Sequence, residues 1–389
     1  MALLAYASLS IKLPGRLSLR YGLINTVILA TLLGSKVTIV AIALTCLLWV
    51  LLKSVLSHRD SKNDGIKIVA GALSLFLIFA IFICHKLNGG TESIAVSINN
   101  IAPWSRADLI LPALTALSFS YVFLRCFDLI RSVVWGQKRL MDPISLLGYI
   151  VPFHMLVSGP ISLYEDHLKA DDGSLDTGPE LTRVLLALNV ITTGLFYKFV
   201  VAEGIRIYFW GMGEPINIDS WPITAIFLIY LFFDFAGYSK VALGLGNLYK
   251  IPTPDNFNKP FLSCSMTEFW TRWHISLGEF VRRNIFYPIQ LPLVRLMGRK
   301  KALIASILTL TLSFAMVGLW HRFTLIFLAW GLAMGLVLAF EKFIREYFQS
   351  TALIQTPFYK IGIRVMGPVY VFVTYTTSIY FVADEIFVK

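Results

Sequence analysis

The sequence carries little charge for its length. Charged residues make up 15% of its 389 residues and hydrophobic residues 57%, with a mean hydropathy of +0.71. Soluble domains have about 25% charged and about 45–50% apolar residues. Several apolar runs approach the roughly 20 residues that a helix needs to cross a bilayer. A large soluble helical protein is the alternative. The composition favours an all-α, polytopic integral membrane protein whose surroundings are the lipid bilayer.

Signatures of metal, nucleotide and hydrolase sites are missing as well. The four cysteines, at positions 46, 84, 126 and 264, form neither a CxxC motif nor a zinc spacing. We find no HExxH, no nucleophile elbow, no Walker loop and no GxGxxG. No nucleic-acid module accompanies the net charge of +11, which we assign to Lys and Arg in cytoplasmic loops. We therefore expect no bound cofactor, no metal and no nucleic-acid partner, and buried structural cysteines.

The apolar runs predict the fold. Inside lipid every backbone polar group needs an internal partner, so long runs without strict alternation predict helices. We expect roughly 10–11 transmembrane helices, together with broken, re-entrant and interfacial helices. They form a single domain over residues 1–389, so chemistry must use residues within or beside the membrane. The runs are 21–33, 37–56, 66–84, 109–130, 143–163, 183–210, 221–245, 302–320, 323–343 and 361–383.

Basic residues indicate the orientation. The segment from Arg282 to Lys301 contains six Lys or Arg residues and no acidic one, so it should be a cytoplasmic loop. The loop around residues 53–67 has the same bias. Residues 165–180 lack this basic excess. Together these segments predict a multi-pass protein with a defined cytoplasmic face.

Two polar clusters interrupt apolar runs in the first half of the chain. Arg125 and Asp128 lie near the end of one run, where local pairing at a helix end is the simpler interpretation. His154 lies between Pro152 and Pro160, which break the hydrogen-bond ladder of a helix. That segment is either a structural kink or a cavity wall. His154 alone is more often a packing residue.

A third cluster, from Asp234 to Pro288, is the most polar of the interruptions. Asp234 interrupts a strongly apolar run, and three prolines exclude a regular helix over 251–260. Ser265 to Glu268 has the form of a capping box, which predicts a helix start. On that aromatic helix Arg272 would pair with Glu268, and His274 would follow Trp270 by four residues. An interfacial helix is the simpler interpretation.

His321 lies between two apolar runs with almost no loop. Either the runs meet in a tight extracellular turn, or they are one interrupted element that enters the protein interior. A histidine titrates near neutrality and can take a proton from a hydroxyl. In the absence of hydrolase and phosphate motifs, this indicates a base-assisted transfer from an activated substrate.

Several stretches of the sequence resemble the membrane-bound O-acyltransferase (MBOAT) superfamily. The similarity rests on DFAGYSKVALGLGNLYKIPTPDNFNKPF, on SMTEFWTRWHISLGEFVRRNIFYP, on the later GLWH and on the segment 157–161. It covers at least residues 157–335. The branch that it resembles is the bacterial one that contains the teichoic acid D-alanyl transfer protein and the alginate O-acetyltransferase membrane subunit.

The resemblance implies that the helices surround a central tunnel. It also implies transfer of a short acyl group from a cytoplasmic thioester donor to a hydroxyl of an envelope polysaccharide or glycopolymer. It maps the catalytic histidines onto His321, as general base, and onto His274. Substrate or tunnel walls map onto Trp320, Arg272, Trp273, Asn258 and Asp234. The donor is an acyl-carrier protein or acyl-CoA, a periplasmic or extracellular transferase is a further partner, and the location is the bacterial cytoplasmic membrane.

Two positions depart from the pattern of the superfamily. Arg322 stands where most members have Gly, and Met334 where many have His. Both departures lie near the expected chamber and bear on the acceptor class. A transporter or export channel for an envelope polymer or acyl donor is the alternative function, because broken polar segments also suit transporters. A scaffold without activity is a third hypothesis, motivated by Arg322.

Overall fold

The computed structural model describes residues 17–57, 64–87, 118–136, 139–172, 180–348, 356–383 and 385. This part of the chain is helical and contains no β-strand, only an isolated bridge between Phe257 and Trp273. The all-α prediction is confirmed. By contact the chain divides into two compact units, residues 1–193 with 238–254, and residues 194–237 with 255–389. The single domain over 1–389 stays a prediction.

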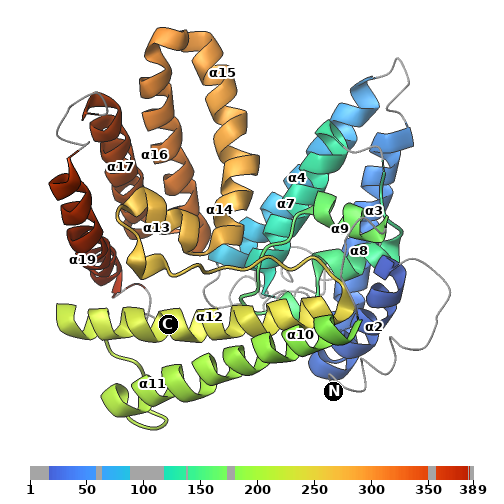
Figure 1. Ribbon diagram of the computed structural model, residues 1–389. Helices are drawn as coiled ribbons and strands as arrows, with labels where there is room; N and C mark the ends of the chain where they lie inside the picture. The colour runs from blue at the N-terminus through green and yellow to red at the C-terminus, as the bar shows by residue number, and fades with distance from the viewer. Residues whose placement is uncertain are drawn as a thin grey trace. The chain divides into compact units, whose positions relative to one another are not determined.

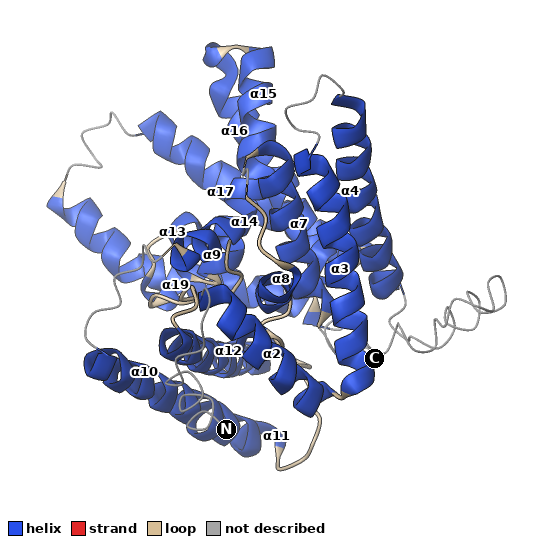
Figure 2. Cartoon of the chain, turned by 90° about the vertical axis from the view of Figure 1, so that its right-hand side faces the viewer, coloured by secondary structure: helices blue, strands red, loops and turns tan. Residues whose placement is uncertain are grey.

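The first unit is a cluster of helices in which α3, α4 and α7 pack side by side, as Figure 2 shows. Helices α2 and α3 are separated at Gly34, whose φ of +85° suits glycine, so the predicted gap between the apolar runs 21–33 and 37–56 is confirmed. The helices that lie wholly in this unit are α2 (Leu17–Leu33), α3 (Ser35–Ser57), α4 (Asp64–Leu87), α7 (Phe119–Trp135), α8 (Pro143–Ile150), η1 (Phe153–Met155) and α9 (Tyr164–Asp171).

Arg125 holds the centre of the first unit together. It lies in the middle of α7, is fully buried, and donates to the carbonyl oxygens of Met155 (2.9 Å), Pro160 (3.3 Å) and Ile150 (3.4 Å). The expected pair with Asp128 at a helix end is therefore wrong. The guanidinium instead binds backbone carbonyls that the broken segment cannot satisfy within a helix.

The run 143–163 is not one span. Helix α8 ends at Ile150 and the chain continues irregularly through the short η1. His154 is buried there, with Nδ1 2.8 Å from the Tyr21 hydroxyl and Nε2 3.0 Å from the Thr253 hydroxyl. Both ring nitrogens have partners, so the packing role expected for His154 is confirmed.

The second unit is built on two antiparallel helices, α16 (Ala302–His321) and α17 (Leu325–Phe348), which lie side by side in Figure 1. A Cβ at Gly331 would lie 2.3 Å from the Phe314 oxygen, and one at Gly318 would lie 2.1 Å from the Phe327 oxygen. Glycine therefore allows the two backbones to touch. The other elements wholly in this unit are η2 (Phe196–Ala202), α11 (Glu203–Trp210), η3 (Pro260–Leu262), α13 (Met266–Arg272), α14 (Ile275–Val281), η4 (Arg282–Phe286), α15 (Tyr287–Met297), η5 (Arg299–Lys301) and α19 (Pro357–Phe381).

Two long helices contribute to both units. They are α10 (Glu180–Leu195) and α12 (Trp221–Tyr249). Within the first unit Arg183 of α10 donates to the carbonyl oxygens of Asn247 (2.8 Å) and Leu248 (2.7 Å) at the end of α12. Within the second unit Lys198 of the π-helix η2 binds Asp234 of α12.

Five helical segments in the described part of the chain are long and apolar enough to cross a membrane. They are residues 35–57, 180–210, 221–249, 299–321 and 325–348. The multi-pass character is thus supported, whereas the central tunnel stays a prediction.

The basic segment expected to be a loop is instead helical over Tyr287–Met297. Cys46 is exposed rather than buried, Cys126 is buried and Cys264 is half-buried. Residues 109–117 of one predicted run, and Arg59 and Lys62 of the basic loop, lie outside the described residues.

Candidate functional site: a cavity lined by a buried histidine

A cavity of about 400 Å³ lies within the second unit, between α13, α14, α16 and α17. Most of its wall is aromatic or aliphatic, and one histidine, His274, belongs to it. The residues that line it are Thr267, Trp270, Thr271, Trp273, His274, Leu277, Gly278, Val281, Arg282, Phe286, Tyr287, Leu310, Ser313, Phe314, Val317, Leu338, Lys342, Arg345 and Glu346.

The cavity has a charged end and an aromatic end. Arg282, Lys342 and Arg345 line the charged end, with Glu346, which is 3.5 Å from Lys342. On α17 the lining residues run from Leu338 to Glu346, eight residues further, which at 1.5 Å per residue is roughly 12 Å. The charged residues of α17 therefore follow Leu338 by one to about two helical turns.

His274 stands at a break between two short helices. Helix α13 ends at Arg272 and α14 begins at Ile275, so the prediction that the helix itself carries the histidine is wrong. The φ of His274 is +47°, a strained value for a residue with a Cβ. Asn256 holds this conformation, because its carbonyl accepts from the Ile275 amide (3.1 Å) and its side-chain oxygen from the Ser276 hydroxyl (2.6 Å).

The surroundings of His274 keep its imidazole neutral. Its side chain is buried, and its ring packs edge-on against Phe235 at 4.9 Å. Burial, and to a smaller extent the charge that His321 can carry, lowers the pKa of His274 to about 3. This residue lies between α13 and α14, outside the five membrane-crossing segments.

His321 is the last residue of α16 and, unlike His274, is exposed. Its ring lies 4.7 Å from Trp320 and 5.8 Å from Trp330, and Trp330 lies 6.4 Å from Trp270 on the cavity wall. Helix α17 begins four residues later, so the two runs meet in a tight turn and the single interrupted element is wrong. The extracellular location of the turn stays a prediction. Next to it, Arg322 binds Glu385, with Nε 3.4 Å from the carboxylate.

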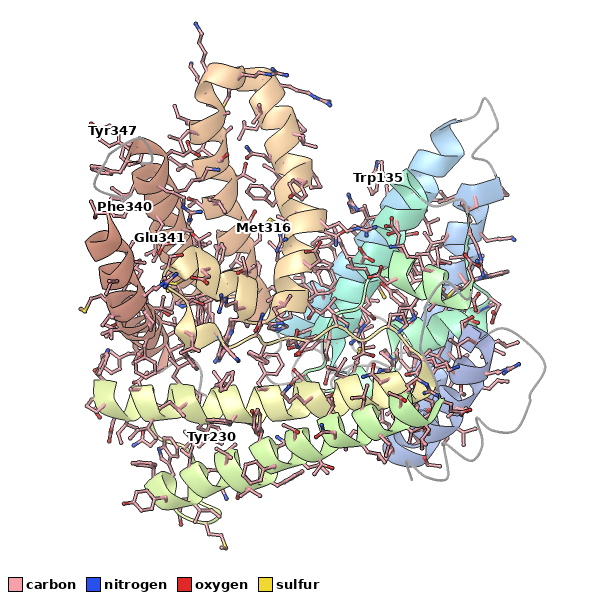
Figure 3. All side chains as sticks on the ribbon, viewed as in Figure 1. Trp135, Tyr230, Met316, Phe340, Glu341 and Tyr347 are labelled. Carbon is pink, nitrogen blue, oxygen red and sulfur yellow. The ribbon has the colours of Figure 1, made fainter. Side chains whose placement is uncertain are left out.

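Two carboxylates and a serine fix the start of α13. Ser265 accepts from the Glu268 amide (3.1 Å), and Glu268 accepts from the Cys264 amide (2.7 Å), close to the predicted capping box. Glu341 of α17 lies beside this helix in Figure 3 and accepts from the amides of Met266 (2.7 Å) and Thr267 (2.8 Å). One side chain therefore accepts hydrogen bonds from the first two backbone amides of α13, which have no acceptor within the helix.

The other predicted site residues divide into two groups. Trp273 is buried and lines the cavity, and Trp320 packs against His321. Arg272 pairs with Glu268 at 2.6 Å, as its spacing predicts, and is not among the lining residues. Asn258 is exposed, and its backbone N–H donates to the Arg272 backbone carbonyl (3.0 Å). Asp234 pairs with Lys198. The structure brings none of these last three into the cavity wall, and their role in binding stays a prediction.

The structure adds residues that the sequence interpretation missed. Asn256 positions His274, Glu341 caps α13, and Ser313 and the basic residues of α17 line the cavity. Glu341 carried a usable signal, since it is an acid within the run 323–343, which is the same feature that singled out Asp234. Among the described residues no cluster of three or more His, Cys, Asp or Glu could hold a metal ion.

The described part of the chain is thus all-helical and multi-pass, and its second unit holds a cavity lined by the buried His274. The model of the MBOAT, membrane-bound O-acyltransferase family, matches residues 38–382. The chain therefore belongs to the membrane-bound O-acyltransferase family.

Three relatives show the range of the similarity. The teichoic acid D-alanyltransferase of Bacillus subtilis (strain 168) is 30% identical over 241 residues, which are 59% of this chain and 61% of that protein. The probable alginate O-acetylase AlgI of Pseudomonas fluorescens is 28% identical over 58% of this chain and 43% of its own. The peptidoglycan O-acetyltransferase of Helicobacter pylori (strain ATCC 700392 / 26695) is 28% identical over 49% and 36%. The matches therefore span between about a third and three fifths of these relatives.

Proposed function

We propose that this protein is an O-acyltransferase that moves a short acyl group from a thioester donor to a hydroxyl of an envelope polysaccharide or glycopolymer. Family membership supports the reaction class, and the names of the relatives refer to teichoic acid, alginate and peptidoglycan. One observation carries the proposal. His274 lines a cavity with a basic end, and ring contacts through Trp270 and Trp330 lead from the cavity wall to His321, which is exposed.

In this proposal His321 is the general base. Its imidazole takes the proton of the acceptor hydroxyl while the hydroxyl oxygen attacks the thioester carbonyl carbon. The carbon–sulfur bond then breaks, and the imidazolium returns the proton to the leaving thiolate. The products are an ester on the acceptor and a free thiol. The exposure of His321 supports contact with a large acceptor.

His274 has a different role in the same step. Because its low pKa leaves it neutral at neutral pH, it can accept or donate a hydrogen bond without adding a second positive charge beside the imidazolium. We assign it to positioning the donor at the inner end of the cavity. Trp273 and Trp320 are walls of the same site, and Arg272, Asn258 and Asp234 are proposed to support substrate binding from outside the cavity wall.

The donor is proposed to be an acyl-carrier protein or acyl-CoA. Both carry their thioester on a phosphorylated arm, and the basic end formed by Arg282, Lys342 and Arg345 supports binding of such an anion. The protein is proposed to act in the bacterial cytoplasmic membrane, together with a periplasmic or extracellular transferase that completes delivery to the acceptor. The acyl group is acetyl, D-alanyl or a similar short one.

Replacement of the exposed histidine tests the proposal. His321→Ala should abolish envelope acylation, measured by mass spectrometry of the envelope polymers, while the amount of protein in the membrane stays unchanged. Phe323→Ala is the matched control, because Phe323 is an exposed residue of the same turn. Normal acylation in His321→Ala would remove His321 from the mechanism. Substrate flux that survives loss of both His321 and His274, without thioester turnover, would support the transporter alternative instead.

A further inference from the structure

Helix α10 belongs to the least covered of the five segments that are long and apolar enough to cross a membrane. In this segment, residues 180–210, 11% of the most apolar stretch is buried, against 33–39% in the other four segments. Residues 184–202 contain one charged side chain, Lys198, and this part of the helix fits the hydrocarbon region of a bilayer. Its uncovered face must therefore meet either lipid or another membrane helix.

The covered face of α10 is the one that packs against α12. A Cβ at Gly244 would lie 2.8 Å from the Ala187 oxygen. A Cβ at Gly237 would lie 2.8 Å from the Gly194 oxygen. Ala187 and Gly194 are about two helical turns apart and so lie on one face. Asn189 follows Ala187 by two residues, which turns it by about 200° around the helix axis, so it lies on the opposite face.

The uncovered face carries a stripe of exposed residues at the spacing of a helix–helix contact. Successive members are four, three and four residues apart, which is the repeat that faces a partner helix in a coiled coil. The side chains of Asn189 and Thr192 have no hydrogen-bond partner among the described residues. The adjacent Thr193, by contrast, donates to the Asn189 carbonyl (2.9 Å). The members of this α10 stripe are Leu185, Asn189, Thr192 and Phe196.

We propose that the α10 stripe is the interface through which two copies of this chain pair in the membrane. Both copies insert with the same orientation, so a twofold axis along the membrane normal places α10 of one copy parallel to α10 of the other. Each residue of the stripe then meets its own counterpart. A carboxamide both donates and accepts hydrogen bonds, so two Asn189 side chains satisfy each other, and a pair of Thr192 hydroxyls does the same.

This self-complementarity favours a second copy over lipid and over an unrelated helix. Hydrocarbon offers no hydrogen-bond partner, and a polar group without a partner in an apolar medium is costly. An unrelated helix would need matching polar groups at the same depth in the membrane. A second copy has Asn189 and Thr192 at that depth already. A single Asn in such a contact also fixes which positions face each other.

Disulfide cross-linking of the full-length protein in liposomes tests the interface. In a chain without its native cysteines, Leu185→Cys and Thr192→Cys should each give a covalent dimer, because a disulfide forms only where two Cα atoms come within about 7 Å. Leu186→Cys is the matched control, since Leu185 and Leu186 are both 58% exposed but point about 100° apart. Equal cross-linking at positions 185 and 186 would indicate random collision and would overturn the inference.

Dilution of the protein in liposomes measures what the polar residues contribute. Asn189→Leu removes the carboxamide from an exposed position, so the thermal midpoint should stay unchanged while the dimer dissociates more readily. Single-molecule photobleaching counts the subunits as the ratio of protein to lipid falls. Dimerisation should weaken by about three- to thirtyfold, the usual effect of hydrogen bonds between membrane helices. Asn189→Gln keeps the carboxamide and should recover part of the affinity. A wild-type protein that is monomeric at every dilution, or an Asn189→Leu variant that pairs as tightly as the wild type, would overturn the inference.

Discussion

Two features of His274 are energetically unfavourable: its left-handed backbone conformation and the burial of its imidazole. The φ of +47° places it in a region that glycine adopts easily and histidine does not. Asn256 and the cavity wall enforce this conformation. Such strained residues persist only where the surrounding structure determines them, and they cluster at functional sites.

Burial of His274 should make the folded protein sensitive to acid. Its folded pKa of about 3 lies below the roughly 6.5 of an unfolded histidine, so below pH 6.5 the unfolded chain binds a proton that the folded chain refuses. The stability from this group is present above pH 6.5 and is lost as the pH falls toward 3. Between pH 6.5 and 5 the loss is about 2 kcal/mol.

Thermal unfolding in nanodiscs at pH 7 and pH 5 measures this loss. His274→Gln does not titrate, so its midpoint should fall less between the two pH values than that of the wild type. Other groups titrate equally in both proteins and cancel in the comparison. Equal falls in the two proteins would show that His274 is protonated in the folded state.

At the scale of elements, the site depends on how α13 and α16 are anchored to α17. Glu341 should be the sensitive contact for α13. Glu341→Ala leaves the amides of Met266 and Thr267 without their acceptor, and losses of a cap cost about 0.5–2 kcal/mol. We expect a lower thermal midpoint and a lower kcat. Glu341→Gln keeps one acceptor oxygen and should recover a large part of both. If the alanine variant lost stability but kept full kcat, Glu341 would not position the site.

The glycine contact between α16 and α17 should tolerate no side chain. In Gly331→Ala the new methyl group would meet the Phe314 oxygen at 2.3 Å, so the helices must separate. Overpacking of this kind costs about 1–3 kcal/mol, and the turn that carries His321 should shift with it. Gly362→Ala in α19 is the matched control, since nothing lies within 4 Å of its added carbon. Thermal unfolding of both variants compares the two sites, and equal midpoints would contradict the close packing.

Sequence patterns predicted elements well where one local rule decides. The break at Gly34, the helix start at Ser265 and the pairing of Glu268 with Arg272 follow from residues within one or two turns, and the structure confirms them. Tertiary partners explain the failures. Arg125 binds carbonyls 25, 30 and 35 residues away, and nothing near it in the sequence indicates them.

The candidate site was predictable in part for the same reason. Histidines are conspicuous in an apolar chain, so His274 and His321 stood out. Three features depend on a second segment that packs against the first. They are the backbone break at His274, the Ser313 hydroxyl that has no hydrogen-bond partner among the described residues, and the cap from Glu341. Periodicity along one helix carries no information about that second segment.

At the scale of the whole molecule, α16 should separate the two faces of the membrane. Its 20 residues rise roughly 30 Å, the thickness of the hydrocarbon core. The basic residues before it predict a cytoplasmic start, and the turn with His321 then faces the opposite side.

Labelling with a membrane-impermeant maleimide tests this orientation. In a chain without its native cysteines, Lys300→Cys should react only from the cytoplasmic side and Phe323→Cys only from the other side. The two positions mark the two ends of the same helix, so each is the control for the other. Labelling of both from one side would contradict a membrane-crossing α16.

The partners of Arg125 also constrain how the chain is made. Among the described residues the guanidinium in α7 donates to carbonyls of residues 150, 155 and 160, all of which are synthesised after it. A buried polar group without a partner is costly. Arg125 can therefore take its buried place only after about 35 more residues have been synthesised and the irregular segment after α8 has packed against α7.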